Sequence, residues 1–410
     1  MQAQQTVRLD TLCEPTFQTR FCLREKAARW LFSSLIAGTL RLHMPSGSRW
    51  VIEGALDGPE AELHIKSWRA LWKTIRKGDL GFADAYIDGD WDTPDLTSLI
   101  RLLGRNRKQL AARITGLPFF RFIPRLKHAA RANTKANSRR NIEAHYDLGN
   151  AFYSRWLDAS MVYSSGIYGP ENTLEGAQKR KLDRITELLA LRDTSSVLEI
   201  GCGWGALAHR IGQATNGPVK GVTLSPSQLE HAQGVVAGQD NIALVLEDYR
   251  DVKGTFDRIV SIEMIEAVGK SYLPTYFAAI SKGLNPGGRA VLQAITIHED
   301  IFDNYERDTD FIQAYIFPGG FLPTKTLLAE EASRAGLKLT HRECFGASYA
   351  KTLDDWQTRF EAAWPEIERQ GFDARFRRTW NYYLSYCSAG FSEGLIDVGL
   401  YVLEPKGETQ

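Results

Sequence analysis

The residues with the clearest chemical signature are one glutamate and three glycines near the middle of the chain. Residues 197–205 read Val-Leu-Glu-Ile-Gly-Cys-Gly-Trp-Gly, and residues 206–211 continue as an amphipathic stretch. The aliphatic run predicts a strand and the stretch after it a helix, so the glycines lie at a strand-to-helix turn. Glycines there tolerate positive φ and let a ligand approach the backbone and the first helical N–H groups. The sequence therefore predicts a ligand site at this turn.

The spacing of the glycines indicates which ligand. A dinucleotide fingerprint has Gly-x-Gly-x-x-Gly and an acid about 20 residues later. Here the pattern is Glu-x-Gly-x-Gly-x-Gly, and the next predicted strand, 219–224, ends near Thr223 and Ser225 without an acid. This pattern is typical of S-adenosylmethionine sites, where no pyrophosphate has to be bound. A tight turn with a purely structural role is the alternative.

The segments around the turn predict the fold that positions it. Short β-branched and aliphatic runs at 243–246, 256–262 and 289–292 alternate with helical patterns. Such alternation predicts a mostly parallel, doubly wound sheet with its ligand at the carboxyl ends of the strands. The fold class we predict is therefore α/β and Rossmann-like, with a smaller α+β domain before it.

The composition of the chain is typical of a globular enzyme without a disulfide framework. The chain has 410 residues, of which 43% are hydrophobic and 24% charged, as expected for a globular enzyme of two or three domains. Its net charge of +1 predicts no strong overall field. Five scattered cysteines argue against a disulfide framework or a zinc site, and for a reducing cytosol. We expect a cytoplasmic protein, with any membrane contact peripheral, because no apolar run is long enough to span a bilayer.

The part of the chain before the catalytic domain has two sections. Residues 20–100 alternate β-type segments (38–42, 50–54 and 61–65) with helical ones (69–76 and 95–103), while 81–91 reads as packing and turns. We expect residues 1–104 to form a small α+β domain that docks on the lipid membrane. Residues 105–140 form a basic linker studded with aromatic residues, and no Asp or Glu occurs between 101 and 140. A solvated linker and a segment attracted to anionic phospholipid are both open interpretations. Nucleic acid is a third, which the small net charge disfavours.

A series of motifs along residues 80–400 resembles the cyclopropane-fatty-acyl-phospholipid synthases and the related mycolic acid cyclopropane synthases. Their order along the chain makes the resemblance more specific than any single motif. The matching segments are 145–150, 161–164, 199–205, 221–228, 248–250, 257–261, 315–320 and 382–384.

The resemblance implies a class I S-adenosylmethionine-dependent methyltransferase domain over 141–410, with a helical insertion at 298–324 that would form the acyl tunnel. Gln228 and Thr223 can hydrogen-bond ribose hydroxyls, and Asp248 can accept from an exocyclic amine. The cofactor-binding residues that it implies are Tyr163, Ser164, Glu199, Gly201, Cys202, Gly203, Trp204, Gly205, Thr223, Leu224, Gln228, Asp248 and Tyr249.

The family's reaction, as the resemblance implies it, adds the sulfonium methyl to a cis double bond and then removes a proton. In the family a bound bicarbonate is the base, held by a Cys, a Glu, a His, a backbone group and a Tyr. Glu266, Tyr349 and the backbone of Ile295 match three of these, whereas Ser165 stands at the Cys position and Gln293 at the His position.

Two further residues bear on the chemistry. Glu263, three residues before Glu266, stands where the family usually has a small residue, and it can supplement the anion site or replace bicarbonate as a direct base. A surface carboxylate at a strand end is the alternative. Cys387 aligns with a cysteine often marked as active-site in the family, although its surroundings favour a buried, inert thiol.

We therefore expect an enzyme that forms a cyclopropane on an unsaturated acyl chain of a membrane phospholipid, at the inner membrane surface, with S-adenosylmethionine and bicarbonate as cofactors. A homodimer and no nucleic-acid partner are part of this expectation. One alternative is C-methylation without ring closure, giving a methyl- or methylene-branched chain. Others are a lipid-binding protein with a degenerate cofactor site and a small-molecule or nucleic-acid methyltransferase.

Overall fold

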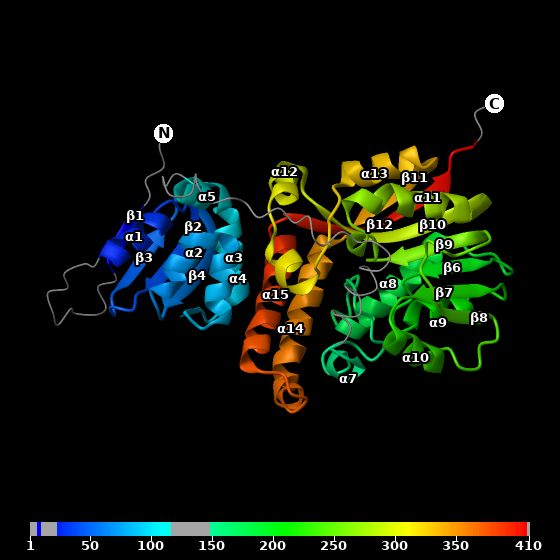
Figure 1. Ribbon diagram of the computed structural model, residues 1–410, viewed down its shortest axis with the longest axis horizontal. Coiled ribbons are helices and arrows are strands. Elements are labelled where there is room, and N and C mark those ends of the chain that lie inside the picture. The colour runs from blue at the N-terminus through cyan, green and yellow to red at the C-terminus, as the bar shows by residue number, and fades with distance from the viewer. Residues whose placement is uncertain (1–5, 10–22, 116–147, 408–410) are drawn as a thin grey trace. The chain divides into compact units, whose positions relative to one another are not determined.

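A computed structural model describes residues 6–9, 23–115 and 148–407, and Figure 1 labels its elements. The chain forms two compact units, one of Met1–Lys127 with Phe372–Glu393 and one of His128–Gly371 with Gly394–Gln410. This division differs from the predicted domains, 1–104 and 141–410, because a late helix belongs to the first unit. Of the predicted linker 105–140, residues 105–115 are described, and residues 116–140 lie outside the described residues.

The first unit is an α+β fold, as predicted. Its five-stranded sheet has the order β1-β3-β2-β4-β5, in which β2 and β4 are parallel and the other neighbours antiparallel. The strands are β1 (Thr6–Leu9), β2 (Ala37–His43), β3 (Arg49–Glu53), β4 (Leu56–Ile65) and β5 (Trp91–Asp92). The helices are α1 (Leu23–Phe32), α2 (Arg69–Lys77), α3 (Asp79–Ile87), α4 (Leu96–Arg105), α5 (Arg107–Thr115) and α15 (Ala374–Ser392).

The sequence prediction did not include two features of the first unit: the helix α3 and the addition of the late helix α15. Most of residues 81–91 is helical rather than turns, since α3 runs to Ile87 before the turn into β5. The late helix α15 is held by Arg378, which donates to the backbone oxygens of Tyr86 and Trp91 at 2.6 and 3.0 Å. Glu393, just after α15, accepts from Arg101 and Arg105 of α4 at 2.9 and 2.7 Å.

The second unit contains the predicted doubly wound sheet. Its seven strands have the order β11-β12-β10-β9-β6-β7-β8, and β12 runs antiparallel to both of its neighbours. Because β6 pairs with β7 on one side and β9 on the other, the chain reverses its direction across the sheet at β6. The strands are β6 (Val197–Ile200), β7 (Val219–Thr223), β8 (Ile242–Leu246), β9 (Phe256–Ile262), β10 (Leu284–Ile297), β11 (Leu337–Cys344) and β12 (Ile396–Pro405).

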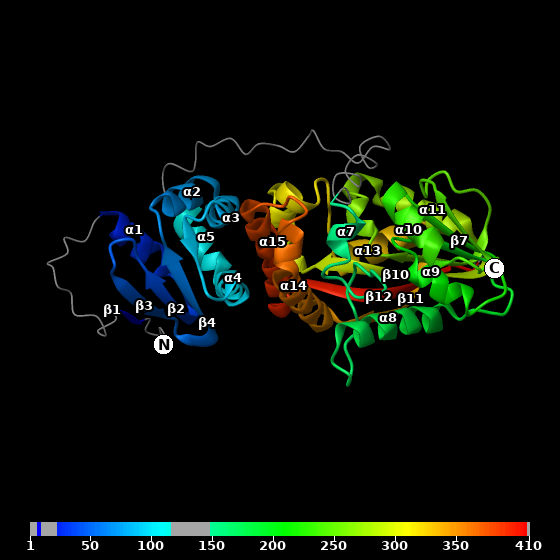
Figure 2. The ribbon, with the colours of Figure 1, turned by 90° about the horizontal axis from the view of Figure 1, so that it is seen from below.

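Helices cover both faces of this sheet (Figure 2). Side chains alternate along each strand, so Val197 and Val260 pack beneath α8 (Leu174–Leu189) and α9 (Ala206–Gly212). On the opposite face, Leu198 and Ile259 pack with α11 (Leu273–Gly283) and α13 (Lys325–Arg334). The helix α10 (Pro226–Val235) contacts β8 at the edge.

The remaining helices lie outside the regular alternation. They are α7 (Asn150–Tyr153), two 3₁₀ turns (Ile265–Ala267 and Lys270–Tyr272), α12 (Glu299–Arg307), a π-helix (Ile312–Ile316) and α14 (Gly346–Glu368). In the described part of the chain, no helix combines the length and apolar character needed to cross a membrane.

Close packing between α2 and α3 gives a test of the first unit. A Cβ added at Gly81 would lie 1.9 Å from the Lys73 carbonyl oxygen, so the helices would have to separate. We expect Gly81→Ala to lower the free energy of unfolding by about 1–3 kcal/mol, measured by urea denaturation. Gly234→Ala in α10 is the matched control, because its Cβ would meet nothing within 4 Å and alanine favours the helix. Equal stability of the two variants would contradict the packing argument.

Candidate active site

The glycine turn lies at the carboxyl end of β6, where the chain changes direction across the sheet. Gly201, Gly203 and Gly205 all have positive φ, 83°, 52° and 92°. A Cβ at Gly201 would lie 3.2 Å from Met264 and one at Gly205 3.0 Å from Ala232, whereas one at Gly203 would meet no described residue within 4 Å. The backbone at Gly203 therefore borders space that a ligand can enter.

The tryptophan within the turn connects it to neighbouring segments. Trp204 is buried, and its Nε1 donates to Asn150 Oδ1 at 2.8 Å. Asn150 Nδ2 in turn donates to the carbonyl oxygen of Ser227, in the first turn of α10. The ring of Tyr153 lies 5.2 Å from that of Trp204 and 5.3 Å from that of Tyr163. These contacts hold α7 and residue 163 against the turn.

At the end of β7, two predicted cofactor residues contact each other. Thr223 Oγ1 donates to Gln228 Oε1 at 3.1 Å, and both side chains are buried. This bond directs the amide nitrogen of Gln228 away from Thr223 and makes it the atom available as a donor. Ser225 caps α10 by accepting from Gln228 N, and Leu224 is half-buried beside it. Their contact with ribose stays a prediction.

Asp248 and Tyr249 follow β8. Both carboxylate oxygens of Asp248 accept from Arg250, Oδ1 from Nε at 2.8 Å and Oδ2 from Nη2 at 2.5 Å. Burial raises the pKa of Tyr249 to about 12, so its hydroxyl keeps its proton at neutral pH. A hydrogen bond from a ligand amine to Asp248 stays a prediction, and it would share that carboxylate with Arg250.

Residues 161–168 run between α8 and α14. Ser164 Oγ accepts from Lys181 Nζ at 2.6 Å, and its carbonyl oxygen accepts from Gln178 Nε2 at 2.9 Å. On the other side, Thr352 Oγ1 accepts from Gly166 N at 3.1 Å. Tyr163 and Ser164 are therefore placed by helices on both sides of the segment.

Two ionisable side chains, Lys181 and Glu199, are buried next to the site. Lys181 is 0% and Glu199 3% exposed. Burial lowers the pKa of Lys181 to about 8, and the charges of Glu263, Asp158 and Glu199 oppose that shift. Burial raises the pKa of Glu199 to about 8, opposed by Lys181 and by a hydrogen bond from the backbone of Ala208.

Three of the five predicted catalytic residues, Ser165, Gln293 and Tyr349, bond Glu263, which lies directly after β9. A fourth, Glu266, lies beside this group. Glu263 Oε1 accepts from Ser165 N at 2.9 Å and from Gln293 Nε2 at 2.6 Å. Its Oε2 accepts from Tyr349 Oη at 2.6 Å. Ser165, Gln293 and Tyr349 are all buried, so Glu263 is not the surface carboxylate that the sequence left as an alternative.

Glu266 lies beside this group. Its Oε1 accepts from Ile295 N at 2.6 Å, whereas its Oε2 is buried without a hydrogen-bond partner among the described residues. Burial raises the pKa of Glu266 to about 8, and the charge of Glu263 adds to the shift. A carboxyl with this pKa is mostly protonated at neutral pH.

The fifth predicted catalytic residue belongs to the other unit of the chain. Cys387 lies on α15 in the first unit, whereas Ser165, Gln293, Glu266 and Tyr349 lie in the second. It is half-buried, so a role in the chemistry stays a prediction. Cys202, within the glycine turn, is buried among Ala208, Ala232 and Leu244, and burial raises the pKa of its thiol.

Lys181 is the residue near the site that the sequence interpretation did not identify. A signal was present, because Lys181 occupies the same helical face as Ala177 and Ile185, at four-residue spacing on the buried side of α8. A lysine at such a position needs an acidic or polar partner.

Comparison with known proteins adds to this geometry. The family described as "Mycolic acid cyclopropane synthetase" matches residues 133–400. The tuberculostearic acid methyltransferase UfaA1 of Mycobacterium tuberculosis is 37% identical over 86% of this chain and 86% of its own length. The cyclopropane-fatty-acyl-phospholipid synthase of Escherichia coli K12 is 36% identical over 81% of this chain and 84% of its own.

A solved structure shares the architecture. Mycolic acid cyclopropane synthase CmaA1, complexed with SAH and CTAB, aligns with a TM-score of 0.61 and 31% identity, covering 65% of this chain and 97% of that one. The predicted Rossmann-like methyltransferase fold is thus confirmed, and S-adenosylmethionine as the cofactor is supported.

The buried acid of β6 predicts a pH dependence of stability. Between the ordinary pKa of 4.5 and about 8, folded Glu199 retains a proton that the unfolded chain releases. Stability attributable to this carboxyl therefore falls as pH rises through that window. We expect Glu199→Gln to reduce the loss between about pH 5 and pH 8 by roughly 1–3 kcal/mol, measured by urea denaturation at each pH.

The control is Glu230→Gln on the exposed side of α10, which should leave the pH dependence unchanged. Parallel pH profiles for the wild type and Glu199→Gln would show that Glu199 is ionised in the folded protein.

Proposed function

The chain belongs to the mycolic acid cyclopropane synthetase family and is an S-adenosylmethionine-dependent methyltransferase, and on that premise we propose that it methylates the cis double bond of an unsaturated phospholipid acyl chain. We propose a cyclopropane as the product. The observation that carries this proposal is the convergence of the glycine turn and two acidic side chains, Glu263 and Glu266, at the carboxyl ends of β6 and β9.

The residues around the turn fit S-adenosylmethionine. The free space beside Gly203 admits a ligand to the backbone, and the amide nitrogen of Gln228 is available as a donor. When bound, this cofactor supplies an electrophilic methyl group on a positively charged sulfur. The aromatic rings of Tyr153 and Tyr163 lie beside the turn and suit a cation.

The insertion between β10 and α13 supports an apolar substrate. Phe321 N donates to the Glu266 carbonyl oxygen at 2.9 Å, and Leu322 N to Tyr305 Oη at 2.9 Å, so the insertion is fixed to the acidic pair. Phe302, Tyr305 and Phe321 pack together there. The π-helix of this segment is a feature often found at functional sites. An acyl chain lying along these side chains would present its double bond away from water.

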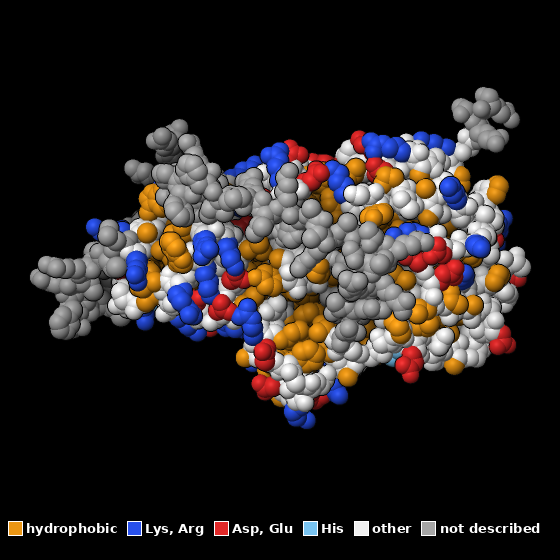
Figure 3. Space-filling model, viewed as in Figure 1, with side chains coloured by type: hydrophobic (Ala, Val, Ile, Leu, Met, Phe, Trp, Pro, Cys, Tyr) orange, Lys and Arg blue, Asp and Glu red, His pale blue; other side chains and the backbone are white. Residues whose placement is uncertain are grey.

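The first unit supports contact with a membrane surface. Trp30, Ile36, Leu56 and Trp72 are between 41% and 60% exposed. Lys and Arg side chains gather over α2, which carries Trp72 (Figure 3). Several of these cations pair with Asp84, Asp88 and Asp90, so the exposed apolar side chains are the stronger support for docking.

A methylene-branched chain is the second candidate product. Ser165 and Gln293 replace the Cys and His that the family resemblance implies, and both bond Glu263. A relative of this chain is named a tuberculostearic acid methyltransferase rather than a cyclopropane synthase. Both products require loss of one proton after methyl transfer, so the same site serves either.

The product decides between them. We expect vesicles of unsaturated phospholipid, incubated with the enzyme and S-adenosylmethionine, to yield acyl chains about 14 mass units heavier, measured by gas chromatography and mass spectrometry. A cyclopropane resists mild hydrogenation, whereas a methylene branch is reduced. The corresponding free fatty acid and acyl thioester are the control substrates, since a phospholipid enzyme should prefer the vesicle.

A faster reaction with the thioester would contradict the phospholipid proposal. Absence of any heavier chain from all three substrates, with cofactor binding confirmed by calorimetry, would contradict lipid methylation itself.

A further inference from the structure

Three separate segments direct hydrogen-bond donors at one carboxylate. Ser165 lies before α8, Gln293 on β10 and Tyr349 on α14, and each donates to Glu263 at 2.9 Å or less. Donors arranged in this way stabilise an anion at a fixed position. Glu263 thus carries, on the chain, the negative charge around which the pocket is built.

The backbone also fixes this carboxylate. Glu263 has φ 47°, in the left-handed region that non-glycine residues rarely adopt, and its N–H donates to the Gln293 carbonyl oxygen at 2.8 Å. Such strain is retained where the surrounding structure enforces it, and it is concentrated at functional sites. The left-handed backbone and this bond therefore help to fix where the Glu263 carboxylate lies.

The two neighbouring acids are in different environments. Glu263 accepts three hydrogen bonds, whereas Glu266 accepts one and leaves Oε2 without a donor among the described residues. Two nearby carboxyls whose surroundings differ divide the charge between them. Burial raises the pKa of both acids, but three hydrogen bonds and the charge of Lys181 oppose the shift at Glu263, whereas only backbone hydrogen bonds oppose it at Glu266. We infer from these surroundings that Glu263 is the ionised member and Glu266 the protonated one.

Resting on the proposed function, we propose that the Glu263 carboxylate is the base that removes the proton after methyl transfer, in place of a dissolved anion. Oε1 accepts two donors and Oε2 one, so a lone pair on Oε2 remains for a proton. The bicarbonate that the resemblance implies does not fit, because a side-chain carboxylate already bonds Ser165, Gln293 and Tyr349.

The same bonds form and break at first for either product. The alkene electron pair forms the new bond to the methyl carbon while the carbon–sulfur bond breaks, its electrons staying on sulfur. Glu263 takes a proton from that methyl group. The electron pair of the broken C–H bond then closes the three-membered ring, or forms a methylene double bond if a hydride has first shifted to the cationic carbon.

Glu263→Gln tests the base. The amide cannot accept a proton at neutral pH, and we expect kcat to fall by at least about 100-fold with little change in KM and in cofactor affinity by calorimetry. Glu263→Gly relieves the left-handed strain and opens the anion position. We expect its activity to be low and to recover with added bicarbonate or formate, whereas wild-type activity is the same with and without bicarbonate.

Glu230→Gln, a surface change, is the matched control and should behave as the wild type. Wild-type turnover that requires bicarbonate, or full activity in Glu263→Gln, would overturn this proposal while leaving lipid methylation intact. A wild type that methylates no lipid would overturn both.

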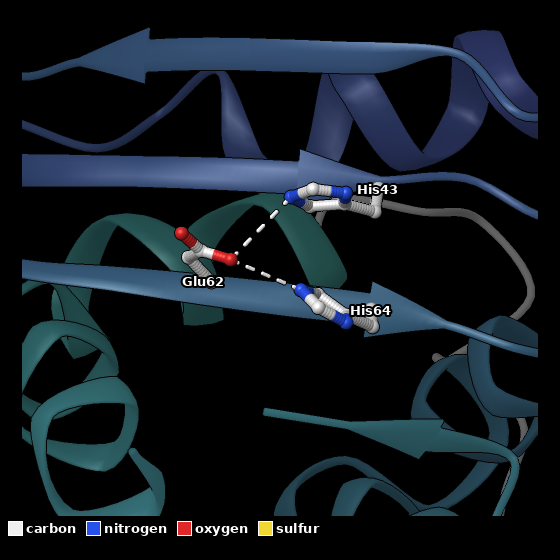
Figure 4. Close-up of side chains that lie close together, drawn as sticks. All are labelled: His43, Glu62 and His64. Atoms are coloured by element: carbon white, nitrogen blue, oxygen red, sulfur yellow. Dashed lines mark hydrogen bonds and ion pairs between the residues drawn. The ribbon is translucent and has the colours of Figure 1, made fainter. Parts of the chain in front are cut away.

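A second inference concerns the first unit, independently of the methyltransferase site. Three side chains point toward one another from β2 and β4 (Figure 4). Glu62 Oε2 lies 3.1 Å from His64 Nε2 and 3.6 Å from His43 Nε2, and the three ligand atoms lie within 4.8 Å of one another. The two imidazole ring centres are 4.2 Å apart.

The sheet fixes this arrangement. His43 pairs directly with His64 across the parallel strands, and Glu62, two residues before His64, projects on the same face. Neighbouring cations on this face have other acids, since Arg41 lies 3.5 Å from Glu60 and Lys66 2.7 Å from Asp92. The side chains of His43, Glu62 and His64 are 28–40% exposed, so an ion can reach them from solvent.

We propose that His43, Glu62 and His64 bind a divalent metal ion of the zinc type, with a fourth position open to water. Two imidazoles and a carboxylate are a donor set that Zn²⁺ prefers. Tetrahedral ligands at about 2.1 Å from zinc lie about 3.4 Å from one another, so only small side-chain rotations are needed.

Titration of the chelator-treated full chain with Zn²⁺ tests this site. We expect calorimetry to show one such site per chain, with Kd raised at least about 100-fold by His43→Ala, His64→Ala or the near-isosteric Glu62→Gln. His341→Ala is the matched control, because His341 and Glu343 form a similar pair, 3.1 Å apart, with a single imidazole.

Absorption of the Co²⁺-loaded chain separates this site from thiols such as the exposed Cys344. Tetrahedral bands without a thiolate transition are expected. Thiolate absorption, no zinc binding by the wild type, or unchanged affinity in the two histidine variants would overturn the proposal.

Discussion

The second unit depends on the balance of charge around one buried ammonium group, that of Lys181. Lys181 has no exposed surface, and it lies in the field of Asp158, Glu199 and Glu263. A buried ion without partners costs several kcal/mol, so these groups have to occur together. Lys181 also donates to Ser164, which joins this electrostatic balance to the segment that runs over the site.

The acids around Lys181, which are Asp158, Glu199 and Glu263, outnumber that single ammonium. This imbalance bears on which carboxyl groups of the site are ionised. Burial raises the pKa of Glu199, Glu263 and Glu266 alike, but at Glu263 three hydrogen-bond donors and the charge of Lys181 oppose the shift, and they favour its ionised form. A positively charged cofactor would enter a site in which the acids around Lys181 outnumber that ammonium. The same physical conditions thus favour cofactor binding and preserve one ionised carboxylate near the reacting carbon.

Local patterns in the sequence predicted those parts of the fold and the site that depend on residues close together in the chain. The glycine turn followed from the strand and helix around it, and the doubly wound sheet followed from alternating segments. Lys181 was missed because its partners lie on other elements, among them Ser164, Glu199 and Glu263, although its helical face gave a signal. The bond of Glu263 to Tyr349 joins residues 86 positions apart, which no local pattern encodes. The Asp-Gly-Asp at 88–90 does form a turn, but the helix α3 before it was missed because composition alone does not show its packing against α2.

The place of α15 and β12 in the two units has a consequence for the order of folding. The first unit is completed by α15, and the sheet of the second unit has β12 between β10 and β11. Neither unit can close until the C-terminal segment has left the exit tunnel, so the usual order, in which N-terminal domains fold first, does not apply. Until then the apolar faces that receive α15 and β12 stay uncovered.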